Sequence, residues 1–137
     1  MSCILRVFGE RLDIDKLIST VSMEPDRVWH KGEPRYKSSP EGDKIIYSGA
    51  FFYASDADMD EPQIQIEEAT EYLNNNLEAI KDMTKFSGVE EVILDFGIEL
   101  RDVAIHSDYL TPALVKVAGE AGIGIELSHY PFADDES

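Results

Sequence analysis

The stretch Cys3–Gly9, CILRVFG, alternates with a period of two residues and therefore predicts a β-strand. Successive side chains of a strand point to opposite faces of its sheet. Cys3, Leu5 and Val7 lie on one side of this strand, and Ile4, Arg6 and Phe8 lie on the other. The first side is wholly apolar, whereas the second carries a cation and an aromatic ring.

Outward from this strand, the chain alternates between strand and helix patterns. Alternation predicts further strands over residues 27–31, 44–54, 89–100 and 123–130. Helical spacing predicts helices over 13–21, 61–85 and 111–121. The first six elements of the order β-α-β-β-α-β-α-β match the split βαβ motif. We therefore expect an α+β fold: a ferredoxin-like antiparallel sheet with an added α–β unit, and helices on one face.

Single residues refine this prediction. Gly49 and Ala50 inside a strand indicate either a close approach by another element or a bulge. Consecutive Asn residues at 74–76 weaken the middle of the long helix. Gly122 suits a helix C-terminal cap. The 137 residues contain no long linker, so we expect one domain over residues 1–132 and an acidic tail over 133–137.

The composition is strongly acidic, with 28 Asp and Glu against 12 Lys and Arg and a formal net charge of -16. Such a chain repels nucleic-acid phosphates and anionic membranes, so neither is an expected partner. The acidity serves either solubility or docking on a basic protein. Cys3 is the only cysteine, and no signal peptide or membrane-spanning run is present, so we expect a cytoplasmic protein.

Residues 25–36, PDRVWHKGEPRY, form a basic island in this acidic chain. They hold the only Trp, and five of the twelve Lys and Arg fall between positions 27 and 44. Strand alternation separates Arg27, Trp29 and Lys31 from Val28 and His30. We therefore expect His30 to face the core and Trp29 to face outward.

If helices cover one face of the sheet, alternation also predicts the side chains on its open face. They are Arg6, Phe8, Arg27, Trp29, Lys31, Asp95, Glu99, Glu126, Ser128 and Tyr130. This set suits a water-covered face with ion pairs such as Arg6 with Asp95 or Glu126. It equally suits a homodimer or partner surface, or a small-ligand site.

Other motifs are weaker. The acidic run at 56–61 spaces carboxylates like a calcium loop but has Glu61 where that loop needs Gly, which favours an acidic helix start. Three scattered His have no metal-ligand spacing, so neither a metal nor a cofactor is expected. Arg101, Asp102, His106 and Asp108 form a polar cluster that could perform acid–base chemistry or simply cap the next helix.

Several segments carry a resemblance to a known family: residues 3–9, 26–34, 55–58, 94–98, 101–102, 107–110 and 122–128. Through them the whole chain resembles a family of small, uncharacterised bacterial proteins of about this length, a domain of unknown function. The resemblance implies a cytoplasmic bacterial protein and brings no assigned activity or catalytic residues.

Two functional hypotheses remain. The first is a non-catalytic acidic binding protein, for example an inhibitor or immunity-type protein, with a protein partner or a homodimer through the open face. The alternative is a small enzyme or anion-binding protein with a site between segment 29–35 and strand end 95–102. The candidate site residues are Trp29, Lys31, Glu33, Arg35, Asp95, Arg101 and Asp102. In the alternative, Lys31 and Arg35 would hold an anion, and Glu33, Asp102 or His106 would move protons.

Overall fold

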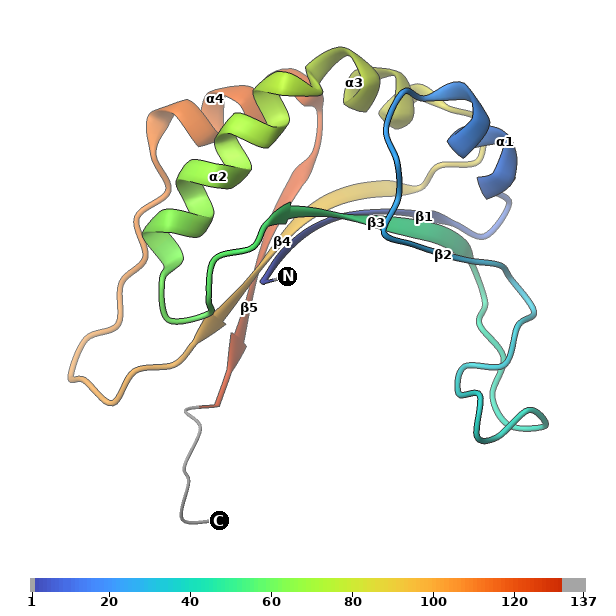
Figure 1. The fold of residues 1–137 in the computed structure, drawn as a ribbon, viewed down its shortest axis with the longest axis horizontal. Helices are drawn as coiled ribbons and strands as arrows, with labels where there is room; N and C mark the ends of the chain where they lie inside the picture. The colour runs from blue at the N-terminus through green and yellow to red at the C-terminus, as the bar shows by residue number, and fades with distance from the viewer. Residues whose placement is uncertain (1, 132–137) are drawn as a thin grey trace.

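The computed structural model describes residues 2–131, which form a five-stranded sheet with helices on one side (Figure 1). The strands are β1 (Cys3–Gly9), β2 (Arg27–Trp29), β3 (Ser48–Ser55), β4 (Glu91–Glu99) and β5 (Gly124–Tyr130). Their order across the sheet is β2-β3-β1-β4-β5, so β1 is the central strand. The predicted acidic tail at 133–137 lies outside the described residues.

The sheet is mixed. β1 pairs antiparallel with both β3 and β4, and β2 pairs antiparallel with β3. β5 instead joins β4 in parallel, because α4 carries the chain back across the sheet between them. The predicted α+β class is confirmed, the element order matches except that the long helix is two helices, and the fifth strand occupies the edge beside β4.

The helices are α1 (Ile14–Thr20), α2 (Pro62–Asn75), α3 (Leu77–Lys85) and α4 (Pro112–Ala121). All of them lie on the upper side of the sheet in Figure 1. Alternate strand residues and the apolar stripes of the helices meet there in one core, whose largest fully buried side chains include Leu5, Phe52, Ile66, Leu94, Phe96 and Leu114. Cys3 belongs to this core, and burial raises the pKa of its thiol.

The predicted long helix over 61–85 is wrong in one respect, because the structure divides it at Asn76. Asn76 has φ -121°, outside the helical range, and its side-chain amide donates at 2.9 Å to the Tyr72 carbonyl, which also accepts the Asn76 backbone N–H. Gly122 does end α4, with φ 78° and its N–H bonded to the Ala118 carbonyl.

The second and third strands are shorter than predicted. β3 begins at Ser48 instead of residue 44, and β2 ends at Trp29. Between them, backbone bonds join Gly32 N–H to the Ile45 carbonyl and Arg35 N–H to the Asp43 carbonyl, each at 2.8 Å. This ladder holds the connecting loop as an irregular extension of the hairpin.

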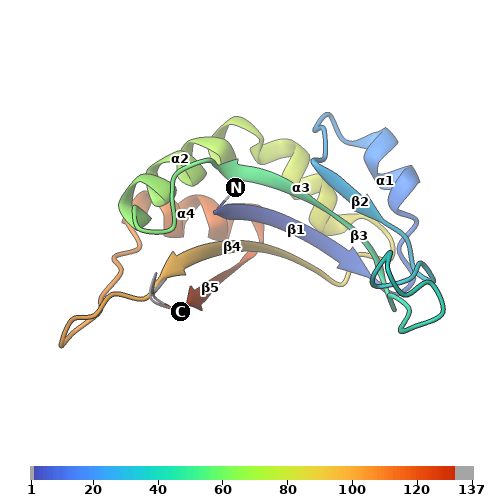
Figure 2. The ribbon, with the colours of Figure 1, turned by 60° about the horizontal axis from the view of Figure 1, so that its bottom comes forward.

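The side of the sheet away from the helices is concave, because the strands arch over it (Figure 2). The loop between β2 and β3 closes one end of this arch, and β5 descends at the other (Figure 1). Among residues 2–131, no helix has the length and apolar character needed to cross a membrane. Within the described part of the chain, no helix covers the concave face, so the strand side chains that point into it are open to solvent.

Candidate functional site

The centre of the open face is an ion-pair network around Arg6 of β1. Its Nη1 lies 3.2 Å from Asp95 Oδ2, and its Nη2 lies 3.0 Å from Glu126 Oε2. Ser128 Oγ donates to the other Asp95 oxygen at 2.7 Å. Both predicted partners of Arg6 are thus present, and they join β1, β4 and β5 across the face.

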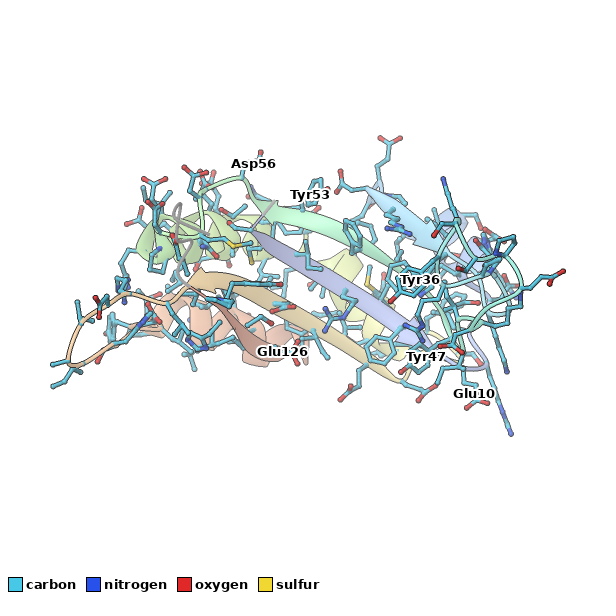
Figure 3. The ribbon with its side chains drawn as sticks, turned by 90° about the horizontal axis from the view of Figure 1, so that it is seen from below. Glu10, Tyr36, Tyr47, Tyr53, Asp56 and Glu126 are labelled. Carbon is cyan, nitrogen blue, oxygen red and sulfur yellow. The ribbon has the colours of Figure 1, made fainter. Side chains whose placement is uncertain are left out.

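Beside this network, the open face contains a pocket of about 470 Å³. We call it the arginine–aromatic pocket; its lining residues are Arg6, Phe8, Arg27, Trp29, Arg35, Ile45, Tyr47 and Phe51. Figure 3 looks onto this face and labels Tyr47 of the pocket, with Tyr53 and Glu126 elsewhere on the same side. The pocket therefore combines three cations with four aromatic rings.

Trp29 forms one wall of the pocket and rests on Gly49 of the neighbouring strand. A Cβ atom at Gly49 would lie 2.6 Å from Trp29 Cζ2, so only glycine leaves room for the indole. The Trp29 and Phe51 ring centroids are 6.3 Å apart, and those of Phe8 and Tyr47 are 5.1 Å apart. The close approach predicted at Gly49 is confirmed, and Trp29 is the element that approaches.

Arg27 and Arg35 supply the uncommitted positive charge of the pocket. Within residues 2–131, neither guanidinium has a carboxylate oxygen within 4.0 Å, whereas Arg6 has two carboxylate partners. Arg35 is placed by the backbone ladder of the loop, since its N–H donates to the Asp43 carbonyl. The pocket thus presents two exposed guanidinium groups beside an apolar wall.

Lys31 and Glu33, both predicted as site residues, take other roles. Lys31 Nζ lies 3.6 Å from Glu10 Oε1, outside the pocket lining. Glu33 Oε1 accepts from the His30 backbone N–H at 2.8 Å and lies 2.6 Å from His30 Nδ1. Glu33 therefore stabilises the turn after β2.

The prediction that His30 faces the core is wrong, because its side chain is 46% exposed. The ring does point toward the helix side, where Nε2 lies 3.0 Å from Asp15 of α1. Hydrogen bonding to Asp15, and next to Glu33, raises the pKa of His30. β2 ends one residue earlier, so alternation no longer carries His30 into the core.

A second cluster, the Asp108 cluster, lies where β4 ends. Asp108 is only 4% exposed; Arg101 Nη2 lies 3.3 Å from its Oδ1, and His106 Nε2 lies 3.0 Å from its Oδ2. His129 of β5 completes the cluster, with Nε2 3.8 Å from Asp108 Oδ2. Asp102 is exposed and belongs to none of these contacts. The predicted polar cluster therefore forms around Asp108.

The structure does not bring the two predicted halves of the site together. Trp29 pairs with Gly49, Gly49 with Phe8, and Phe8 with Glu91, the first residue of β4. Glu99, the last residue of β4, lies roughly 26 Å from Glu91 at the usual rise per strand residue, and Arg101 is two residues beyond Glu99. The arginine–aromatic pocket and the Asp108 cluster are consequently separate sites at opposite ends of the sheet.

Sequence reasoning missed the contribution of β3 and its preceding loop to the pocket. Phe51 alternates with the buried Phe52, so the period of two in SGAFFYAS already indicated an outward ring. Ile45 and Tyr47 precede the regular strand, and no periodicity placed them. His129 was likewise assigned no role, because its partners are distant in sequence.

The chain matches a family model described as Domain of unknown function (DUF4279) over residues 1–132. This match confirms the resemblance to a family of unknown function. No curated protein matches the chain, and no solved structure matches it.

Proposed function

Because the chain belongs to the family described as Domain of unknown function (DUF4279), whose description assigns no activity, we propose a function from the open face. The protein is a non-catalytic binding protein that holds a small organic anion in the arginine–aromatic pocket. The observation that carries this proposal is the concentration of three arginines in one hollow of a chain with net charge -16. Two of those arginines have no carboxylate partner within the described residues.

The shape and chemistry of the pocket indicate the class of ligand. Its volume of about 470 Å³ falls in the range of sites for small molecules. Guanidinium groups bind carboxylates, sulfonates and phosphates through paired N–H donors, and aromatic walls bind flat apolar bodies. A ligand with an aromatic or apolar body and one or two anionic groups matches both features.

The lining argues for binding without catalysis. Its eight residues include no Ser, Cys, His, Lys, Asp or Glu, the residue types that most often act as nucleophiles or general bases. Arginine stays protonated in proteins, so these guanidinium groups bind charge and do not transfer protons. Binding is the function that this set of side chains performs best.

Fluorescence titration tests the proposal directly, because Trp29 is the only tryptophan and lines the pocket. We would titrate aromatic carboxylates, sulfonates and phosphate monoesters beside their neutral amide or alcohol counterparts. At least one anion should shift the Trp29 emission saturably, and its neutral counterpart should not. Arg35→Ala and Arg27→Ala should each weaken binding roughly tenfold, the usual loss of a charge-assisted hydrogen bond.

Arg11→Ala is the matched control, because it removes an equal charge at an exposed position outside the pocket. The affinity of this variant for the anion should stay within about twofold of the wild type, because salt screens a charge far from the pocket. A panel with no saturable member, or an affinity unchanged in the Arg27→Ala/Arg35→Ala double variant, would overturn the proposal.

The net charge of -16 favours a second candidate, an acidic protein that docks on a basic partner in the manner of an inhibitor. Charge complementarity supports a basic partner. The single buried, unpaired cysteine fits a location in the cytoplasm, where disulfides are rare. Affinity capture at low salt, followed by light scattering with wild type and Trp29→Ala, separates the two candidates and a homodimer. A monomer that recovers no basic protein at low salt counts against docking and leaves the small-anion proposal standing.

A further inference from the structure

The Asp108 cluster contains the donor set of a transition-metal site. Folding brings together one carboxylate and two imidazoles from two segments that the sequence separates: His106 and Asp108 from the connector after β4, and His129 from β5. One potential ligand atom from each residue lies within 4.8 Å of the other two. The sequence offers no such spacing, so only the fold reveals the set.

The distances suit a shared ion. Nitrogen and oxygen ligands bind Zn²⁺ at about 2.0–2.2 Å in a tetrahedron, which sets neighbouring donor atoms roughly 3.4 Å apart. The Nε2 atoms of His106 and His129 lie 3.0 and 3.8 Å from Asp108 Oδ2, on either side of that value. The two rings meet edge to face with centroids 5.7 Å apart, so they approach the carboxylate from different directions.

The carboxylate is already oriented for this role. Arg101 Nη2 lies 3.3 Å from Asp108 Oδ1, so the other carboxylate oxygen, Oδ2, faces the two imidazoles. Outer partners that orient a ligating carboxylate in this way are typical of metal sites. The Asp108 side chain is 4% exposed, whereas those of His106 and His129 are 15% and 38% exposed. An ion can therefore arrive from solvent on the histidine side.

We propose that His106, Asp108 and His129 bind a divalent transition-metal ion of the zinc class, with its fourth position open to solvent. Two imidazoles and a carboxylate are a borderline-soft set, which favours Zn²⁺, Co²⁺ or Ni²⁺ over Ca²⁺ or Mg²⁺. The ion ties the connector that follows β4 to the edge strand β5. This site is independent of the arginine–aromatic pocket at the other end of the sheet.

A hydrogen-bonded cluster without metal is the competing account. The Arg101 N–H lies 3.4 Å from His106 Nδ1, a long contact that places the ring proton on Nε2, facing Asp108. Metal binding at Nε2 moves this proton to Nδ1 and opens the contact. In the competing account His129 contributes little, because 3.8 Å from Asp108 is beyond hydrogen-bond distance. His129 is therefore the residue that distinguishes the two accounts.

The test is metal titration of untagged protein after treatment with a chelator. Isothermal titration calorimetry with Zn²⁺ and visible absorption with Co²⁺ should both show saturable binding of one ion per chain. Zn²⁺ should also raise the melting temperature of the wild type. His129→Gln should weaken binding by more than about 100-fold, at least the usual loss for an outer partner, while its circular dichroism matches the wild type.

Two controls use the rest of the chain. His30→Gln removes the third histidine, far from the site, and should leave the affinity unchanged. Asp58→Asn/Asp60→Asn disrupts the exposed acidic group of Asp58, Asp60 and Glu61 and should also leave it unchanged. Wild-type protein without saturable one-to-one binding, or His129→Gln protein that binds as tightly as the wild type, would overturn the metal site. Neither result bears on anion binding by Trp29 fluorescence.

Discussion

At the residue scale, the most constrained position on the open face is Gly49. A Cβ atom there would lie 2.5 Å from the Val7 carbonyl oxygen as well as 2.6 Å from the Trp29 ring. The carbonyl belongs to the backbone of the central strand, so relieving that clash requires a shift between β1 and β3, and the indole must move as well. A single methyl group at Gly49 therefore alters both the sheet and the wall of the pocket.

We expect Gly49→Ala to lower the free energy of unfolding by about 1–3 kcal/mol, the usual cost of overpacking. Urea unfolding measures this loss, and the Trp29 emission maximum should shift in the folded state. Gly124→Ala in β5 is the control, because a Cβ atom there meets nothing within 4 Å. Equal stability for the two variants would contradict the account of Trp29 packing on Gly49.

His30 gives the second prediction at this scale. Its pKa in the folded protein is raised above the value of about 6.5 expected in the unfolded chain. The contribution to stability is then complete below pH 6.5 and is lost as pH rises through the folded pKa.

The stability difference between wild type and His30→Gln should accordingly be larger at pH 6 than at pH 9. Urea unfolding at both pH values measures it, and an NMR titration of the His30 ring locates the folded pKa. A difference that does not change with pH would show that the contacts with Asp15 and Glu33 do not favour the protonated ring.

At the element scale, α4 has one glycine inside it and another at its C-terminal cap. Gly119 lies inside the helix, where an added Cβ meets nothing within 4 Å, and Gly122 caps it with φ 78°. Alanine should therefore have opposite effects at the two positions.

We expect Gly119→Ala to raise the free energy of unfolding by about 0.5–1 kcal/mol, and Gly122→Ala to lower it by about 1 kcal/mol. Thermal and urea unfolding of both variants beside the wild type provide the measurement. If Gly122→Ala were neutral, the left-handed cap would not be what ends α4.

Elements were also the scale at which the sequence was most informative. The alternation in Cys3–Gly9 and over residues 89–100 predicted strands, and one alternate set of residues in each is buried because that face packs on helices; Gly97 is buried as well. The run of Asn at 74–76 indicated the weak point of the long helix, but not its complete division, which follows from the non-helical backbone of Asn76 at φ -121°. The end of β2 depended on the loop ladder through Ile45, which local periodicity does not show.

The candidate sites were less predictable for the same reason. Trp29, Arg35 and Asp95 were candidate site residues; Trp29 and Arg35 line the arginine–aromatic pocket, and Asp95 pairs with Arg6 on the same face. Arg101 was assigned to the same site as Trp29, because sequence patterns do not give strand register. Register carried the two segments to opposite ends of the sheet.

At the scale of the whole molecule, a net charge of -16 repels itself when the chain becomes compact. Raising NaCl from about 0.01 M to about 1 M shortens the Debye length from about 30 Å to about 3 Å. Exposed ion pairs such as that between Lys31 and Glu10 contribute little, so their screening costs little. We expect the melting temperature to rise over this range, as differential scanning calorimetry would show. A falling melting temperature would mean that specific ion pairs outweigh the general repulsion.

The central position of β1 has a consequence for synthesis on the ribosome. This strand emerges first, yet both of its neighbours come later, β3 from Ser48 and β4 from Glu91. Until β4 has emerged, a nascent chain holds its central strand with one hydrogen-bonding edge unsatisfied, and such edges recruit other chains. The order of the strands therefore places the period of greatest aggregation risk during translation of the segment from β3 to β4, which contains helices α2 and α3.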